Sequence, residues 1–552
     1  MRAYHPYPGK NGSTHISMLP SNDIFHSDSH CMMVLLSRIL MTFFIFLLSA
    51  CMVGPDYKEP KHSIAQHWKK TSKTVKENTR QNAHWWRAFH DPVLNALIQR
   101  GYTHNLSLQA TAAHVLQARA LLAQSVGELY PQQQILNGNL IYNRIGGQSL
   151  QFVLPSTFYT DTFGINASWE IDFWGKYRRA VLANDANFLA SYAAYDNALV
   201  TLSADIANTY IGIRTTQELI RVTEKNIKVQ HAILAITKTR FREGQTSLLD
   251  VEQAQSILSQ TEASLPPFRA QLQQQKDHLG VLLGTTPDKV DGFLTPHGRI
   301  PTAPTNVAVG IPRETLAKRP DIYEARMQVI AQSETIGAIK ASLFPSFALT
   351  GTFAFAANTI NQSSLGDLFD WSSRTVTTGP GFTWPILNYG QITNMVRTQD
   401  AVFQQALLNY QNKVLSAQQE VQDNITQFIE SRKSADALRT ANNAAISSTN
   451  LSMIRYKEGQ ADFTPVLQSE MQQLDIQISY TNAQGEVPQA LVALYRSLGG
   501  GWQIRNGNDI VPNEIKKEMA ARTDWGGLLK QSKHEPPKTK SQQIQERYIP
   551  EW

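Results

Sequence analysis

One cysteine of this sequence stands where a covalent modification is expected. Arg38 is followed by an apolar run, residues 39–50, that ends in Leu-Ser-Ala directly before Cys51. The run is too short to cross a bilayer and has the length of the apolar part of a signal peptide. Small residues before a cysteine allow a lipoprotein signal peptidase to cut there, so the pattern predicts that Cys51 becomes the first mature residue and carries a diacylglyceryl group. Since acyl chains contribute about 0.8 kcal/mol per buried methylene, a multiply acylated Cys51 would be a stable membrane anchor.

The residues around this cysteine leave one alternative and suggest a location. The alternative is that Cys51 is a buried cysteine behind an ordinary signal peptide. Met52 follows it rather than an aspartate, which by resemblance to lipoprotein sorting favours the outer membrane. Residues 1–30 are polar and unlike the start of a signal peptide, so initiation near Met32 or Met33 is a reasonable hypothesis.

Polar residues also gather beside two glycine turns. Phe-Arg-Glu-Gly-Gln at residues 241–245 recurs as Tyr-Lys-Glu-Gly-Gln at residues 456–460. Glycine can take the left-handed conformation that ends a helix, so Gly244 and Gly459 are predicted to end long helices and start hairpin turns. Arg242 and Asp250 lie beside the first turn, where a solvated pair at a helix end would contribute little stability.

These residues do not form a catalytic constellation. The sequence has no Walker loop, no nucleophile elbow and no pair of histidines at metal-ligand spacing on a helix. Its 14 histidines are scattered, and its two cysteines, Cys31 and Cys51, leave no disulfide for the mature body. We expect no enzyme, no metal site and no cofactor other than the covalent lipid. The net charge is +6, but Lys and Arg are scattered along the chain and are densest in the C-terminal tail, so nucleic acid is not an expected partner.

The body of the chain is one unit used twice. Besides the glycine turns, Trp169 and Gly175 recur as Trp384 and Gly390 at the same offset. Each half is predicted to contain a helix, two strands and two helices. The expected domains are a signal peptide at 1–50, a lipid-anchored extension at 51–84, repeat 1 at 85–284, an equatorial linker at 285–311, repeat 2 at 312–502 and a tail at 503–552. The tail is expected to be equatorial at first and disordered from Lys516, since it is rich in Lys, Gln and Glu.

Four segments alternate between apolar and polar residues, the pattern of strands with one apolar face. They centre on residues 163–173, on residues 347–355, on Phe382, Trp384 and Ile386, and, more weakly, on residues 132–143. Half-apolar strands more often pack on a soluble core. Each segment, however, has about the length of a tilted transmembrane strand, and aromatic residues cluster on all four. Four strands cannot close a barrel and an open edge in lipid leaves backbone groups unsatisfied, so we predict a barrel shared between three chains.

Two long segments, residues 176–240 and 391–455, contain no proline and little glycine. A helix of about 65 residues would reach on the order of 95 Å, longer than an ordinary globular domain. Apolar residues such as Val414, Val421 and Phe428 are mixed with alanine, which suits the wall of a coiled coil better than a deep core. The predicted fold class is mixed α and membrane β: a trimeric shared 12-stranded β-barrel, four strands per chain, continuous with a long α-helical coiled-coil barrel.

Four motifs occur in order along the chain: Cys51-Met52-Val53-Gly54-Pro55-Asp56-Tyr57, Arg319-Pro320-Asp321-Ile322, Phe344-Pro345-Ser346 and Leu498-Gly499-Gly500-Gly501-Trp502. Together they resemble the TolC-like outer-membrane factor family, specifically the lipoprotein branch that serves drug-efflux pumps of the resistance-nodulation-division type. Each motif is weak alone, but their order across nearly the whole mature chain is specific. The resemblance implies a homotrimer in the cell outer membrane whose helices form a tunnel through the periplasm.

The resemblance also implies partners and a site. The partners would be a periplasmic adaptor protein, an inner-membrane efflux pump of the resistance-nodulation-division type, and outer-membrane lipid. Gly244 and Gly459 would lie at the periplasmic mouth, where the adaptor docks. The residues at positions where relatives place gate or constriction residues are Arg242, Asp250, Tyr456 and Gln468. Relatives commonly carry acidic residues on the second tip helix, whereas this chain has Pro465 and Gln468, so a carboxylate ring is not expected.

The expected function is therefore the outer-membrane channel subunit of a tripartite efflux pump that conducts drugs or other small molecules. Two alternatives remain open. One is a TolC-like duct for protein secretion, which would share the fold. The other is a periplasmic scaffold lipoprotein that forms no channel.

Overall fold

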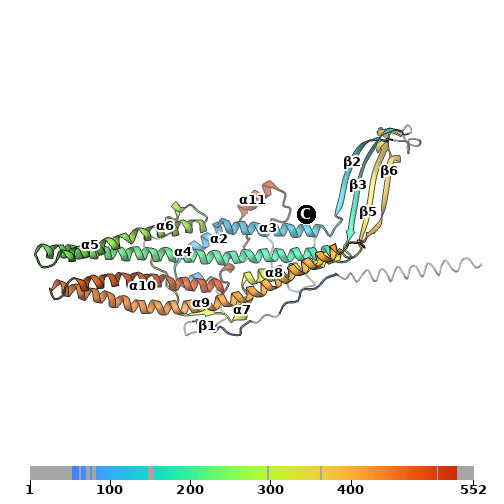
Figure 1. Cartoon of the computed structure of the whole chain (residues 1–552). Coiled ribbons are helices and arrows are strands. Elements are labelled where there is room, and N and C mark those ends of the chain that lie inside the picture. The colour runs from blue at the N-terminus through green and yellow to red at the C-terminus, as the bar shows by residue number, and fades with distance from the viewer. Residues whose placement is uncertain are drawn as a thin grey trace, which may run out of the picture. The chain divides into compact units, whose positions relative to one another are not determined.

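The computed structural model describes residues 52–60, 64–69, 75–77, 83–146, 155–294, 298–360, 364–505 and 508–530. The chain divides into two compact units, Met1–Met52 and Val53–Trp552. All helices and strands described below belong to the second unit (Figure 1). The predicted signal peptide and the predicted lipid attachment at Cys51 lie outside the described residues.

In the first half of the second unit, two helices lead into a pair of strands, and a very long helix follows. Asp91 caps the N-terminus of the first of these helices, because its carboxylate accepts hydrogen bonds from the backbone N–H groups of Val93 and Leu94. The elements of this half are α2 (Pro92–His104), α3 (Leu106–Gly127), β2 (Gln133–Arg144), β3 (Thr157–Ile171), α4 (Lys176–Arg242), α5 (Leu248–Ala263) and α6 (Leu265–Leu282). The break between α5 and α6 falls at Ser264 because the prolines that follow have no N–H to donate.

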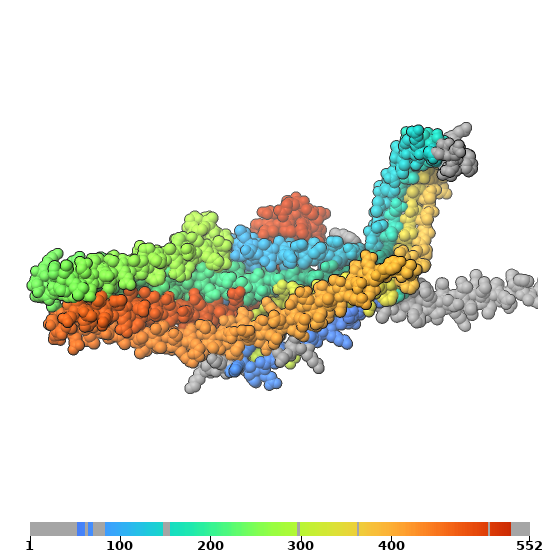
Figure 2. Space-filling model, in the orientation of Figure 1, coloured from blue at the N-terminus to red at the C-terminus, as the bar shows by residue number. Residues whose placement is uncertain are grey.

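The second half has the same order of elements, except that the single helix α10 (Thr464–Ser497) stands where the first half has α5 and α6. Its elements are α7 (Pro312–Ala317), α8 (Pro320–Ala341), β5 (Ser346–Asn358), β6 (Arg374–Thr383), α9 (Gln391–Lys457) and α10. The helices α4 and α9 are each 67 residues long, so each rises about 100 Å. In Figure 2 the strands stand at the end of these helices that is opposite to their hairpin turns.

The four long strands form one antiparallel sheet in the order β2-β3-β5-β6. The strand predicted around Phe382, Trp384 and Ile386 was wrong in position. β6 ends at Thr383, and Trp384 and Ile386 follow it; the indole of Trp384 donates to the carbonyl of Leu343 at 3.1 Å. The strand itself is rich in threonine and glycine and contains Pro380, which hides it from an alternation search. Proline is tolerated there because β6 is an edge strand of this sheet.

The register gives the sheet one apolar and one polar face, because residues directly opposite each other point to the same side. On the apolar face Ile165 pairs with Leu136 on one side and with Phe353 on the other, and Phe353 pairs with Val376. On the polar face Asn166 pairs with Thr352. Large apolar side chains that stay exposed on the sheet include Leu136, Leu140, Phe163, Ile165, Trp169, Leu349, Phe353, Val376 and Phe382.

Shorter elements pack around the middle of the long helices. The strands β1 (Val75–Glu77) and β4 (Val307–Val309) form a small parallel sheet that the sequence did not predict. The other elements there are η1 (Trp85–Phe89), η2 (Pro287–Phe293), η5 (Trp502–Arg505) and α11 (Asn513–Arg522), whereas η3 (Leu365–Phe369) and η4 (Trp371–Ser373) lie between β5 and β6 and pack against the sheet. The largest hydrophobic cluster joins residues of η1, α2, β4 and the C-terminal segment to α4, α9 and α10.

The described N-terminal residues of the second unit, 53–60 and 64–69, run along the helices as a strap. The backbone N–H of Val53 donates to the carbonyl of Trp174 at 3.1 Å. Further along, the backbone N–H of Lys69 donates to the side chain of Gln422 in α9 at 2.8 Å, and the indole of Trp68 donates to the carbonyl of Gly310 at 2.7 Å.

The expectation of disorder from Lys516 was wrong for residues 516–530. Lys516 belongs to α11, and Ile515 and Met519 pack against the main hydrophobic cluster. The guanidinium of Arg119 in α3 donates to the carbonyls of Leu528 and Lys530, each at 2.7 Å. The charged composition of this segment concealed two apolar residues at helical spacing, and these are enough to dock a short helix. Residues 531–552 lie outside the described residues.

Candidate functional site at the hairpin tips

Two hairpin turns join α4 to α5 and α9 to α10, and each contains a glycine in the left-handed conformation. Gly244 has φ +72° and Gly459 has φ +69°. In each turn the residue after the glycine donates its backbone N–H to a carbonyl of the last helical turn: Gln245 to Arg240 and Gln460 to Arg455, both at 2.8 Å. These bonds satisfy carbonyl groups that a helix end leaves open. The turns therefore lie where the glycines were predicted to place them.

Tyr456 lies in the contact between the two hairpins. Its side chain is 3% exposed, and its ring meets the edge of Phe463 with ring centres 5.3 Å apart. The guanidinium of Arg240, from α4, lies over the same ring at 4.7 Å and donates to the backbone carbonyl of Tyr456 at 2.6 Å. A cation at the C-terminal end of α9 also complements the helix dipole. Arg240 thus ties the first hairpin to the second.

The other predicted residues are not brought together within one chain. Arg242 and Gln468 are exposed, and Asp250 lies in the first turn of α5, where its carboxylate accepts a hydrogen bond from the hydroxyl of Thr246. Among the described residues no ion pair joins Arg242 to Asp250. The role of these residues at a gate stays a prediction.

Sequence reasoning missed Arg240, although a signal for it existed. Arg240 and Arg455 occupy the same place before their Glu-Gly-Gln turns, where basic residues commonly bind the last carbonyls of a helix. Arg240 faces inward to the second hairpin, whereas Arg455 is exposed. The repeat motif could therefore identify the pair but not the member that bridges the hairpins.

A polar seam continues above the tips between α4 and α10. The side-chain amide of Asn226 donates to that of Gln477 at 2.7 Å. Nearer the tip, Glu470 is 4% exposed, and one of its carboxylate oxygens has no hydrogen-bond partner among the described residues. Burial raises the pKa of Glu470, and the neighbouring Gln230 side chain offsets this only in part. The phenol oxygen of Tyr456 is likewise buried without a partner in the described chain. Unsatisfied buried groups cost about 1–3 kcal/mol each, so this contact is weaker than its burial suggests.

A buried charge network holds the helices together further from the tips. The guanidinium of Arg319 donates to both carboxylate oxygens of Asp321, at 3.0 and 2.9 Å, and to Glu420 of α9 at 2.8 Å. It also donates to the carbonyl of Ser497 at the end of α10, at 2.5 Å. The Arg-Pro-Asp motif therefore connects α8, α9 and α10.

An exposed apolar sheet face, a polar face behind it and helical hairpins of this length define a class of protein: channel proteins of the outer membrane. The model of the outer membrane efflux protein family matches residues 97–285 and 311–500, and the chain belongs to this family.

Individual relatives agree with this assignment over most of their length. Cation efflux system protein CusC of Escherichia coli O6:H1 is 26% identical over 476 residues, which cover 83% of this chain and 97% of the relative. Probable outer membrane lipoprotein SilC of Salmonella typhimurium is 27% identical over 477 residues, covering 84% and 99%. The solved structure of the outer-membrane channel OprN is 28% identical, superposes with a TM-score of 0.75, and covers 82% of this chain and 100% of that chain.

Two further properties concern only the part of the chain that the structure describes. None of its helices combines the length and the apolarity needed to cross a membrane. Its His, Cys, Asp and Glu residues form no group of three or more that could hold a metal ion.

Proposed function

We propose that the chain is the outer-membrane channel subunit of a tripartite efflux pump and conducts drugs or other small molecules from the periplasm and the pump to the exterior. The observation that carries this proposal is the sheet. Its apolar face is exposed, with Ile165 51% and Leu136 61% exposed, while its polar face carries hydrogen-bonded amides and hydroxyls. A soluble protein gains nothing from such an exposed apolar surface, whereas lipid would cover it.

The same sheet supports a trimer. Within the described residues β2 and β6 each pair on one side only, and an open edge in lipid leaves N–H and C=O groups unsatisfied. Membrane barrels need at least about eight strands, so four strands call for partners of the same kind. Because the sheet is antiparallel and has an even number of strands, β6 of one copy would meet β2 of the next in antiparallel orientation. Three copies would close a 12-stranded barrel, as the sequence predicted.

An internal duplication explains how one chain builds both parts of this duct. In each half two helices, two strands and a long helical hairpin follow one another, and the glycine turns at Gly244 and Gly459 have the same hydrogen bonds. Each half would supply two strands to the barrel and one long helical hairpin to the coiled-coil wall. The trimer would then have six similar hairpins around its axis.

The hairpin tips are the proposed docking site for a periplasmic adaptor protein, through which an inner-membrane pump of the resistance-nodulation-division type would deliver substrate. The proposed gate includes Tyr456 with Arg240, and Arg242, Asp250 and Gln468 as residues free to contact neighbouring copies. The covalent lipid on Cys51 would anchor the N-terminus in the outer membrane. Replacing Cys51 with alanine is expected to abolish incorporation of labelled palmitate, and Cys31→Ala, the other cysteine, serves as the control.

The direct test of the channel is conductance of the purified chain in planar bilayers, together with its oligomeric state in detergent. A heat-modifiable trimer that conducts ions supports the proposal. A stable monomer without conductance contradicts it and favours the scaffold lipoprotein.

A gene deletion then defines the cargo. Loss of the channel is expected to raise the accumulation of one or more of a panel of dyes, antibiotics and metal ions; metal ions belong in the panel because one relative is named for cation efflux. Loss of an exported protein with unchanged accumulation of small molecules would favour the secretion duct instead.

A further inference from the structure

The polar face of the sheet carries almost no ionisable side chain. Apart from Ile135, Ile141 and Phe158, its members are amides, hydroxyls and small residues such as Asn139 and Thr162. Among the described residues of this face the ionisable exception is Glu170, at the helix end of β3; Arg144, Asp161 and Arg374 belong to the same strands but lie on the opposite face. The ammonium of Lys176 lies 3.1 Å from its carboxylate, and the hydroxyl of Tyr177 donates to it at 2.9 Å. This face therefore has no unpaired fixed charge.

Hydrogen bonds between the side chains hold this face in place. The amide nitrogen of Asn166 donates to the amide oxygen of Asn137 on β2 at 2.7 Å. The hydroxyl of Thr352 on β5 donates to the amide oxygen of Asn166 at 2.8 Å. Near the other end, the amide of Asn143 donates to the hydroxyl of Thr160 at 3.1 Å. The polar surface is thus neutral and ordered across three strands.

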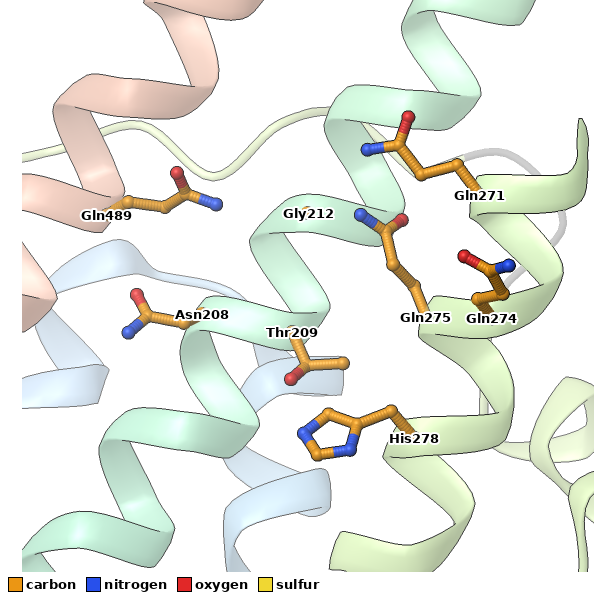
Figure 3. A pocket seen from close by; sticks show the side chains of 8 residues that line it. All are labelled: Asn208, Thr209, Gly212, Gln271, Gln274, Gln275, His278 and Gln489. Carbon is orange, nitrogen blue, oxygen red and sulfur yellow. The ribbon is translucent and has the colours of Figure 1, made fainter. Parts of the chain in front are cut away.

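A second uncharged surface lies on the long helices. A groove of about 450 Å³ crosses α4 between α6 and α10 (Figure 3). Five side-chain amides line it, from three helices: Asn208, Gln271, Gln274, Gln275 and Gln489. His278 is the one ionisable side chain among its described lining residues. The nearby carboxylate of Asp205 lies 3.8 Å from the guanidinium of Arg496, its partner on α10.

The groove lies on the face of α4 that the shorter elements leave open. Ile206, Tyr210 and Ile213 of α4 are buried in the main cluster with α2 and the C-terminal segment. Since successive helical residues turn by about 100°, Asn208 and Gly212 point to roughly the opposite side of α4. The shorter elements therefore cover one face of the helical wall, and the groove lies on another face, where Asn208 and Thr209 are partly exposed and Gly212 is buried.

We propose that the polar face of the sheet and the amide groove line one uncharged path, so that this channel passes anionic, cationic and neutral small molecules alike and does not select cations. The inference rests on the proposed channel function and adds the charge class of its substrates. Pores that select cations place rings of Asp or Glu along the path. A fixed charge acts over about 8 Å at physiological ionic strength, so a surface without such charges neither concentrates nor repels an ion.

The test measures the local potential with thiol reagents on the full chain in outer-membrane vesicles. Asn139→Cys places a thiol on the polar face, Leu140→Cys places one on the apolar face next to it, and Gln274→Cys places one in the groove. Each is treated with a cationic and an anionic methanethiosulfonate of similar size, and the ratio of the two rates is compared with that of a small free thiol. The unsubstituted chain gives the background from Cys31 and Cys51, the two native cysteines.

The expected result is that the cysteines at 139 and 274 react with both reagents, with rate ratios within about fivefold of the free thiol, while the cysteine at 140 is protected. As a positive control, Thr162→Asp, directly opposite position 139, should shift the ratio there towards the cationic reagent.

Each contrary outcome has a distinct meaning. A ratio beyond about fivefold at position 139 or 274, with position 140 still protected, overturns the uncharged path and leaves the channel standing. An unreactive cysteine at 274 overturns the part of the proposal that concerns the groove. Equal reactivity at 139 and 140 contradicts the proposed channel itself.

Discussion

Arg240 and Arg242 stand two residues apart near the end of α4 and point to different sides of it, and only Arg240 reaches the second hairpin. Its guanidinium covers the ring of Tyr456 and caps the end of α9. A hydrogen bond from a charged donor contributes about 1.5–3 kcal/mol and a cation–π contact about 0.5–2 kcal/mol. The contact between the hairpins therefore depends on one side chain more than on any of the exposed residues around it.

Replacing Arg240 with alanine is expected to loosen the tips, at a cost of about 2 kcal/mol to the contact between the hairpins. If the tips restrict the channel, the variant should show a larger or more often open conductance in planar bilayers. Arg242→Ala removes the same charge from an exposed position and serves as the matched control. Equal conductance of the two variants would show that Arg240 does not restrain the tip.

Glu470 makes the same contact sensitive to pH. Burial raises its pKa above the ordinary value of 4.5, so the folded state holds the proton more tightly than the unfolded state does. Stability is therefore full below the ordinary pKa and falls as pH rises through the raised value. Glu470→Gln is expected to be the more stable protein at neutral pH and to lose this pH dependence, measured by thermal unfolding in detergent across a pH series. Glu486→Gln, exposed on the same helix, should keep the pH dependence of the parent; a parent whose stability rises with pH over this window would refute the assignment.

Part of this site could be predicted from the residues alone. The glycines predicted both turns, because few residues other than glycine adopt the left-handed conformation that the turn between two helices requires. Tyr456 was found as well, but its burial and its contact with Arg240 depend on how two hairpins far apart in sequence pack. Glu470 gave no signal at all: one carboxylate among many polar residues shows its burial only in the folded chain.

At the scale of elements, the sheet depends on which face of each strand meets lipid. Ile165 and Asn166 are neighbours on β3 and point to opposite faces. Ile165→Arg is expected to prevent assembly, because a charged side chain on the lipid face costs about 2–4 kcal/mol near the middle of the bilayer. Asn166→Arg, on the polar face, should assemble. The measurement is the yield of heat-modifiable trimer in the outer membrane, and a reversed order of the two yields would mean that the faces are assigned the wrong way round.

The network around Arg319 makes a second prediction about elements. Arg319→Met leaves the carboxylates of Asp321 and Glu420 and the carbonyl of Ser497 without their shared donor. Removing one partner of a buried ion pair costs about 3–5 kcal/mol, so the melting temperature in detergent should fall clearly. Arg313→Met, exposed in the neighbouring helix α7, should change it little. Similar melting temperatures for both variants would show that the network is not needed to hold α8, α9 and α10 together.

Periodicity predicted the long helices and three of the four strands because these elements obey one regular pattern over many residues. It failed for β6, where threonine, glycine and proline replace the apolar alternation. It also missed the pairing of β1 with β4, since segments of three residues carry no period. For α11 the charged composition led to a wrong prediction of disorder, because two apolar residues dock the helix onto the main hydrophobic cluster and the many charged residues do not prevent this.

At the scale of the whole molecule, the chain matches the family model, and its relatives match it over nearly their whole length. These matches establish an outer membrane efflux protein. The trimer goes beyond one chain and rests on physical argument, whereas the adaptor, the pump and the gate are inferred from the family resemblance. The argument for the trimer comes from the sheet, because backbone groups in lipid must find partners. The charge class of the cargo follows from the neutral surfaces on the sheet and in the amide groove.

The unpaired edges of β2 and β6 have a genetic consequence. Because each barrel needs strands from all three chains, one subunit with a defective edge strand prevents the barrel from closing, even when the other two subunits are normal. If wild-type and defective subunits were made in equal amounts and mixed at random, about one trimer in eight would contain wild-type subunits alone. An allele that damages either edge should therefore be dominant over the normal gene, whereas an allele that prevents the chain from folding at all should be recessive.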